Sequence, residues 1–276
     1  MKSRALCVCA MIALTAGSAG AQVVLDGNMD ALAVGTAPDN AVGAGAWAFP
    51  ANYVAAGVAE PLARPEIYTI VPTNSFDPTG TGNSLRLNNP TGTSAENYHL
   101  PNIWSQSFSA APGLVLRVTF NLWVAQGSGG GSIYVGGDNG GGGFSNATGD
   151  RTAQLTWLAD GTFNYANSAG VNNFLTNYTT GVWQNVQIDI DTNARNYDLF
   201  WSTGSNPLAQ IGNDLVFRAP NPALSVIYDR ISYVQFGATV GNASSYLDNV
   251  AVQAIPAPGG VGLLGLAGLL AARRRR

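Results

Sequence analysis

The sequence contains few of the residues that enzymes commonly use for catalysis. Both cysteines lie in the first nine residues, as Cys7 and Cys9, and the only histidine is His99. A Ser-His-Asp triad would have to use this histidine, and no nucleophile-elbow motif is present. These absences argue against nucleophilic catalysis. The cysteine positions also exclude disulfides from the rest of the chain.

Charge is equally sparse and unevenly placed. Charged residues make up 11% of the 276 residues, whereas glycine occurs 34 times. The two ends hold six of the 13 basic residues, and all 16 acidic residues lie between them. The body therefore has seven basic and 16 acidic residues, a net charge of −9. Such an acidic body argues against nucleic acid as a partner. The shortage of Lys and Glu also disfavours long helices.

The N-terminus has the three parts of a secretory signal peptide. Lys2 and Arg4 form a basic region, Ala5–Ala16 is apolar, and Ala19-Gly20-Ala21 is a small-residue cleavage site. We therefore predict a signal helix within residues 1–21, export through the Sec machinery, and a mature chain that begins at Gln22.

The C-terminus, residues 255–276, is a second predicted signal. A Pro256-Ala257-Pro258 breaker precedes a short apolar helix within Gly259–Ala272, and the chain ends in four arginines. The apolar run is shorter than the ~20 residues that a spanning helix needs. Clustered arginine directly after it is typical of a segment whose basic end stays in the cytoplasm. The four arginines are Arg273, Arg274, Arg275 and Arg276.

This layout resembles the PEP-CTERM sorting signal of Gram-negative bacteria that make exopolysaccharide, although Ala257 replaces the usual Glu. The resemblance implies transient anchoring in the inner membrane, processing by an exosortase-type enzyme, and delivery to the cell surface or extracellular matrix. An ordinary short C-terminal membrane anchor is the alternative reading.

Between the two signals, residues 22–254 have the pattern of a single all-β domain. Leu114–Val124 alternates strictly between an apolar and a more polar face, which is typical of a half-buried strand. Two hairpins follow, one of them turning at Asp160-Gly161. The remaining expected strands are Val23–Leu25, Glu66–Val71, Ser84–Leu87, Ile103–Phe108, Ile133–Val135, Thr152–Leu158, Thr162–Tyr165, Val182–Ile190, Tyr197–Trp201, Leu215–Arg218, Ile231–Ala238 and Tyr246–Val252.

Several of these segments resemble strands of concanavalin-like and laminin-G-like jelly rolls. The similar segments are Leu25–Asp30 with Val34–Thr36 and Trp47, Thr180–Val186 with Ile188–Asp191 and Tyr197–Phe200, and Tyr246–Val252. The resemblance and the strand spacing together predict an antiparallel β-sandwich of the jelly-roll type.

Asp248 is the best candidate for a metal ligand. It shares a period of two with Tyr246 and Val250, which would turn its carboxylate inward unless a bulge intervenes. In the jelly rolls that the chain resembles, an ion is often held where the first and last strands meet. This resemblance implies a calcium site formed by Asp26, Asn28, Asp30 and Asp248. The alternative role of Asp248 is to accept hydrogen bonds from turn backbone.

Exposed aromatic residues are the candidates for glycan binding, because sugar rings stack on flat apolar surfaces. Trp123 lies on the more polar face of its predicted strand and is the first choice, followed by Trp104 and Tyr98. Trp183 and Trp201 are expected in the core.

Glycoside hydrolysis requires two carboxylates across the scissile bond. The hydrolases among the resembling jelly rolls carry Glu, Asp and Glu at alternate positions of one strand. Here the three glutamates, Glu60, Glu66 and Glu96, are not spaced in that way. Asp189 and Asp191 share a strand face and remain a weaker alternative.

The sequence therefore predicts a non-enzymatic protein of the cell surface or matrix, associated with exopolysaccharide or biofilm. A calcium-dependent, lectin-like carbohydrate-binding module is the first alternative, and a glycoside hydrolase is the weaker one.

Overall fold

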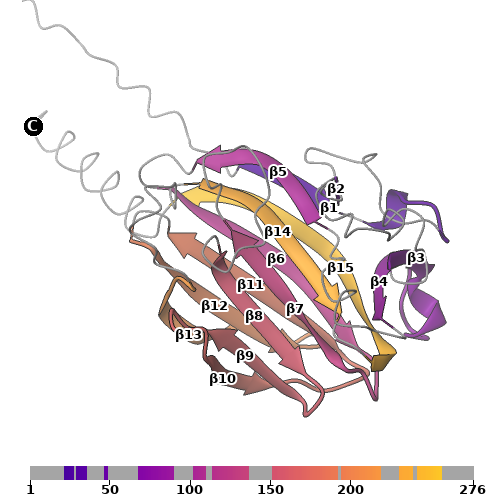
Figure 1. Cartoon of the computed structure of the whole chain (residues 1–276). Helices are drawn as coiled ribbons and strands as arrows, with labels where there is room; N and C mark the ends of the chain where they lie inside the picture. The colour runs from indigo at the N-terminus through magenta and orange to yellow at the C-terminus, as the bar shows by residue number, and fades with distance from the viewer. Residues whose placement is uncertain are drawn as a thin grey trace, which may run out of the picture.

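The computed structural model describes residues 22–27, 29–35, 47–48, 68–89, 102–109, 114–136, 151–191, 194–218, 230–238 and 241–256. This part of the chain forms two antiparallel sheets stacked face to face (Figure 1). Two short 3-10 helices, η1 (Met29–Ala31) and η4 (Thr73–Ser75), accompany the strands. Within the described residues, no helix has both the length and the apolar character needed to cross a membrane.

The first sheet, called the A sheet, contains both the first and the last strand of the described chain. Its strands follow the order β13-β12-β11-β6-β15-β4-β3, and β1 also pairs with β15. These strands are β13 (Ala209–Val216), β12 (Asn196–Thr203), β11 (Trp183–Asp191), β6 (Leu114–Val124), β15 (Gly241–Pro256), β4 (Asn83–Asn89), β3 (Tyr68–Pro72) and β1 (Gln22–Gly27).

The second sheet, called the B sheet, follows the order β10-β9-β8-β7-β14-β5-β2. Both sheets are therefore built from strands distant in sequence. The B-sheet strands are β10 (Asn172–Asn177), β9 (Thr162–Ala166), β8 (Arg151–Leu158), β7 (Gly130–Gly136), β14 (Arg230–Ala238), β5 (Asn102–Ser109) and β2 (Trp47–Ala48).

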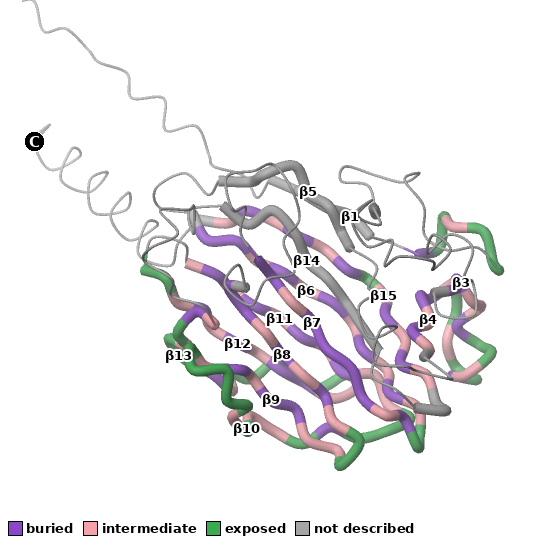
Figure 2. The backbone as a smooth tube through the Cα atoms, viewed as in Figure 1, coloured by how far each residue is buried: buried purple, intermediate pink, exposed green. Residues whose placement is uncertain are grey.

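The core lies between the sheets and is built from alternate residues of each strand (Figure 2). In β6 the residues Leu116, Val118, Phe120, Leu122 and Val124 are at most 1% exposed. The facing layer from the B sheet includes Ile133, Leu155 and Phe163, all fully buried. Because successive side chains of a strand point to opposite faces, the intervening residues form the outer faces.

One buried hydrogen bond connects the two sheets through the core. The indole Nε1 of Trp157 on β8 donates to the hydroxyl of Ser245 on β15 at 2.9 Å. Trp157 is fully buried and Ser245 is 1% exposed. A buried indole N–H needs such a partner, so this bond fixes how β8 sits over β15.

The all-β sandwich predicted from the sequence is confirmed. The strand predicted over Leu114–Val124 is β6 with the same bounds, and the Asp160-Gly161 turn joins β8 to β9. The last strand ends at Pro256, at the predicted breaker. Two strands were missed, β2 and β10, because neither has an alternating apolar pattern. The strand predicted over Leu215–Arg218 overlaps β13 only at its last two residues. The two predicted signal helices, within residues 1–21 and 259–272, lie outside the described residues.

The bond between the sheets generates a stability prediction. Trp157→Phe should lower the free energy of unfolding by about 2 kcal/mol, because it leaves a small cavity and an unpaired buried hydroxyl on Ser245. Urea denaturation would measure this change. Trp183→Phe is the matched control, since its indole also donates one hydrogen bond but its side chain is half-exposed. Equal losses in the two variants would contradict the role assigned to Trp157.

Candidate functional site: the outer face of the B sheet

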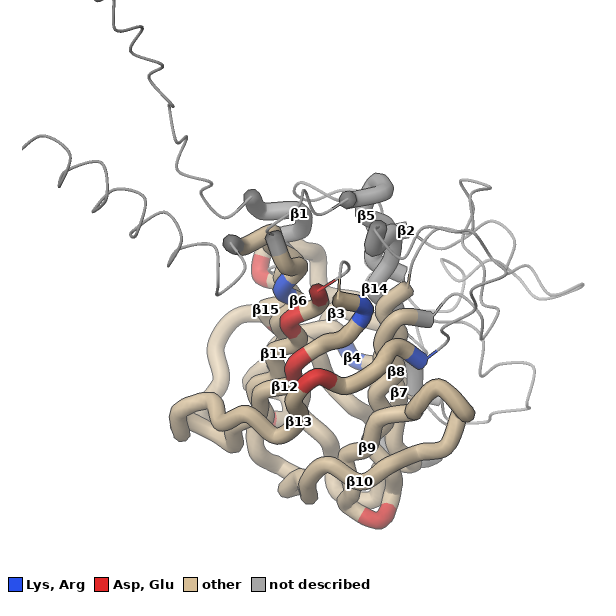
Figure 3. Tube along the Cα trace, turned by 90° about the vertical axis from the view of Figure 1, so that its left-hand side faces the viewer, with Lys and Arg blue, Asp and Glu red and all other residues tan. Residues whose placement is uncertain are grey.

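The B sheet has an outer face without acidic residues. No strand of this sheet contains Asp or Glu, and its only charged positions are Arg151 and Arg230, each the first residue of its strand. In Figure 3 the acidic residues gather instead around β11, β12 and β15 of the A sheet. The outer face of β7, β8 and β9 presents hydroxyl and amide groups, from Ser132, Tyr134, Gln154, Thr156 and Asn164.

Several of these polar side chains are buried. Thr152 is fully buried, Asn164 is 6% exposed and Ser132 is 7% exposed. Among the described residues, five buried side-chain polar atoms have no hydrogen-bond partner, and three of them belong to this face: Thr152 Oγ1, Thr156 Oγ1 and Arg218 Nε. Buried polar atoms are normally paired, and atoms of this kind are commonly completed by a bound water molecule.

Arg218 reaches this face from the end of the A sheet. Phe217 is buried in the core, and the next residue, Arg218, donates its backbone N–H to the carbonyl of Thr152 at 2.9 Å. The guanidinium lies against Gly170, whose φ is +80°. A Cβ there would sit 2.6 Å from Nη2 of Arg218. A side chain at this position would thus both strain the turn and displace the arginine.

The outer face of the A sheet is different, because its aromatic groups contact one another. The ring of Phe76 stacks on Tyr246 at a centroid distance of 3.7 Å and meets Trp123 and Trp183 edge-on at 5.6 and 5.9 Å. Trp183 also donates from Nε1 to Asp77 Oδ2 at 3.0 Å. The cluster thus holds η4 and the residues after it against the sheet.

This cluster contains the first-choice glycan residue, Trp123. Its half-exposed ring packs against Phe76 and Trp183, so part of its surface is already covered. The expectation that Trp183 lies in the core is wrong, because it pairs with Trp123 across β11 and β6 and shares its outer face. Trp201 is 6% exposed and does lie in the core. Trp104 lies in β5 opposite Tyr233, and its side chain is outside the described part, as is the whole of Tyr98.

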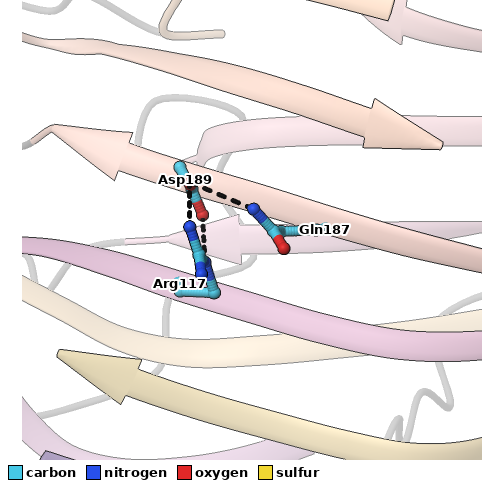
Figure 4. Close-up of polar contacts among 3 residues, drawn as sticks. All are labelled: Arg117, Gln187 and Asp189. Carbon is cyan, nitrogen blue, oxygen red and sulfur yellow. Dashed lines mark hydrogen bonds and ion pairs between the residues drawn. The ribbon is translucent and has the colours of Figure 1, made fainter. Parts of the chain in front are cut away.

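Asp189, proposed as a catalytic carboxylate in the weaker alternative, is held in an ion pair (Figure 4). Arg117 donates to it from Nε at 2.8 Å and from Nη2 at 2.7 Å, and Gln187 donates from Nε2 at 3.2 Å. Asp191 ends β11, and its Oδ1 accepts from the backbone N–H of Ala194 at 2.9 Å. Both carboxylates therefore have structural roles on the A sheet, away from the neutral outer face of the B sheet.

The inward orientation of Asp248 was expected unless a bulge intervened, and β15 does contain such a bulge. The register shifts between Asp248 and Ala251, and Asn249 has a φ of +50°. Leu247 and Val250 are fully buried, while Asp248 is only half-buried and lies on the outer face. Its Oδ1 accepts from the backbone N–H of Asn249 at 2.7 Å, which matches the alternative role of binding local backbone.

Two of the four predicted calcium ligands lie near each other. Asp30 and Asp248 interact electrostatically, and Asp30 Oδ1 also accepts from the backbone N–H of Asn83 at 2.7 Å. Asp26 lies opposite Ala251 in β1, but its side chain and the whole of Asn28 fall outside the description. In the parts of the chain described, no group of three or more potential metal-binding side chains converges. Calcium binding therefore stays a prediction.

The environment of Asp248 generates a pH prediction. Burial is the largest effect and raises its pKa from 3.8 to about 6; the Asn249 bond opposes this shift, and the charge of Asp30 adds to it. The folded state then binds more protons than the unfolded state between these values, so the free energy of unfolding should fall as pH rises from about 4 to about 6.

Asp248→Asn should flatten this decline, which urea denaturation at several pH values would measure. If calcium binds, it should stabilise the wild type at pH 8 more than this variant. An unchanged pH profile in Asp248→Asn would contradict the assigned pKa.

The fold defines the class of protein: an antiparallel β-sandwich of the jelly-roll type. A family model for the glycoside hydrolase 131 catalytic N-terminal domain matches residues 143–219, less than half of the chain. The matched stretch runs from just before β8 to just after β13. No match was found among the curated proteins.

Two solved structures are similar to this chain over most of its length. The catalytic domain of a glycoside hydrolase family 131 protein from Coprinopsis cinerea has 16% identity and a TM-score of 0.52, covering 84% of this chain and 94% of its own. A GH131 β-glucanase catalytic domain from Podospora anserina has 16% identity and a TM-score of 0.51, covering 84% of this chain and 95% of its own. At this identity the structural similarity establishes the fold.

These findings correct the predicted non-enzymatic role, which the match to a hydrolase catalytic domain contradicts. The prediction treated catalytic carboxylates as a pattern on a single strand. Two carboxylates can instead come from different segments that only the fold brings together. The B-sheet face was also missed, because scattered Thr, Asn and Ser have no spacing that distinguishes them from ordinary solvent-facing residues.

Proposed function

We propose that this protein is a glycoside hydrolase that acts on a neutral β-glucan bound across the outer face of the B sheet. The observation that carries the proposal is the match of residues 143–219 to a glycoside hydrolase catalytic domain. That stretch supplies β8, β9 and β10, and hence Thr152, Thr156 and Asn164 of the polar face.

The chemistry of the face supports an uncharged polysaccharide as the substrate. Hydroxyl and amide groups can both donate and accept hydrogen bonds, as sugar hydroxyls do. Thr156 is half-buried on this face, and its Oγ1 has no partner within the protein. The absence of carboxylates from the B-sheet strands means that the hydrolytic pair would come from the connecting segments.

The three glutamates are the first residues to test for this pair. Wild-type protein should release reducing ends from a soluble β-glucan. Of the variants Glu60→Gln, Glu66→Gln and Glu96→Gln, at least one should lower kcat by about 10²-fold or more, because general acid–base catalysis contributes on that scale. Asp189→Asn is the control and should keep its activity, since Asp189 is an ion-pair partner on the A sheet.

Two outcomes would contradict the hydrolase. Folded wild-type protein that releases no reducing ends from any β-glucan would rule it out for this substrate class. Tight glucan binding without cleavage would instead favour a carbohydrate-binding module, the first alternative from the sequence.

Export and C-terminal sorting form the second part of the proposal, based on the sequences of residues 1–21 and 255–276. The enzyme would be secreted, anchored in the inner membrane by its tail, and released by an exosortase-type enzyme to the surface or matrix. There it would meet extracellular polysaccharide.

Intact mass measurement of the protein from its native envelope tests both signals. We expect a chain that begins at Gln22 and lacks the terminal arginines. Replacing all four of Arg273, Arg274, Arg275 and Arg276 with Ser should leave the tail uncleaved and the protein in the membrane fraction. A native mass equal to that of the full chain would overturn both assignments.

A further inference from the structure

Phe174 is an unusual residue to find at the edge of the polar face. It lies in β10, the edge strand of the B sheet, and is 60% exposed. The other large apolar side chains exposed in the described part are aliphatic: Val34, Val171, Leu208 and Val216. A single exposed apolar side chain is ordinary on a protein surface, so what distinguishes Phe174 is its place beside the polar groups of this face.

Strand register aligns Phe174 with the polar groups of the face. Phe174 lies opposite Asn164, Asn164 lies opposite Thr156, and Thr156 lies opposite Ser132. Residues directly opposite each other in a sheet share a face. The row therefore crosses β10, β9, β8 and β7, and with strands ~4.8 Å apart it is about 14 Å long.

A bulge in β10 separates Phe174 from the core. The register shifts between Phe174 and Thr176, which leaves Leu175 as an extra residue. Leu175 packs against the core, whereas Phe174 stays on the outer side. Bulges commonly re-aim a side chain in this way.

The rest of the row consists of neutral polar residues that have little exposed surface. Asn164 donates from Nδ2 to Thr162 Oγ1 at 2.9 Å, which holds its amide in place. Thr156 Oγ1 is buried without a partner, and Ser132 is 7% exposed. An apolar ring followed by neutral donors and acceptors suits a sugar chain, whose rings have apolar C–H faces and hydroxyl edges.

We propose that Phe174 stacks on one sugar ring of a neutral glucan that lies across the strands, with the following sugars over Asn164, Thr156 and Ser132. This assignment rests on the proposed function. It adds two features: the glucan lies across the strands, and Phe174 binds it at one end of the site. Phe174 then binds substrate away from the bond that is cleaved. Its removal should weaken the binding of long chains more than it slows the reaction.

The test measures binding and cleavage with the full mature chain. Phe174→Ala should weaken binding of a β-glucan hexasaccharide about tenfold by calorimetry, in line with the energy of aromatic stacking, and raise KM on long glucan with little change in kcat. Phe174→Trp should restore binding. Val216→Ala, at an exposed position of β13 in the other sheet, is the matched control and should change neither quantity. Thr156→Val should also weaken binding, because it removes the hydroxyl.

The outcomes separate this assignment from the proposed function. If the wild type neither binds nor cleaves glucan, both fail. If the wild type cleaves glucan and Phe174→Ala keeps the same KM and affinity, only the role of Phe174 is overturned. If Phe174→Ala instead shifts the elution volume in gel filtration without changing affinity, the ring is a contact between copies of the chain and the stacking role is likewise overturned.

Discussion

The packing of two sheets through one apolar layer is the constraint on which this structure depends. Every second residue of the long strands points into that layer; Val118 in the A sheet and Leu155 in the B sheet are examples. The Trp157–Ser245 bond fixes the two layers against each other within it. Hydrophobic burial of this extent dominates folding stability, so the core leaves only the outer faces and the connecting segments for function.

The outer faces of the two sheets differ in how their side chains are paired. On the A sheet, most of the polar and aromatic groups described are paired within the protein: Asp189 with Arg117, Trp183 with Asp77, and Phe76 with Tyr246. The buried Nε of Arg86 on β4 is an exception, since it has no partner. On the B sheet, Thr152, Thr156 and Arg218 each have a buried atom without a partner. Paired groups stabilise the fold, whereas a buried polar atom without a partner costs stability. The outer face of the B sheet is distinguished instead by strands without carboxylates, and the candidate site is assigned to this face.

The contrast also explains why the aromatic residues were ranked wrongly. Trp123 was chosen because it alternates with apolar neighbours, and it does lie on an outer face. The alternation could not reveal that Phe76, 47 positions earlier, would pack against it. Phe174 could not be identified from the sequence, because the residues of β10 do not alternate between apolar and polar. The orientation of the Phe174 side chain also depends on a bulge.

The sequence by itself determined the fold class and the approximate position of most strands, because a period of two in hydrophobicity is a local property that a sandwich core enforces on each strand. It could not determine the phase of Asp248, which a single bulge inverts, or the convergence of Thr152, Thr156 and Arg218. Those features arise from register between strands and from the connection that carries Arg218 from the A sheet to the B sheet. Such long-range pairings exist only once the chain has folded, and they decide which surface can bind a substrate.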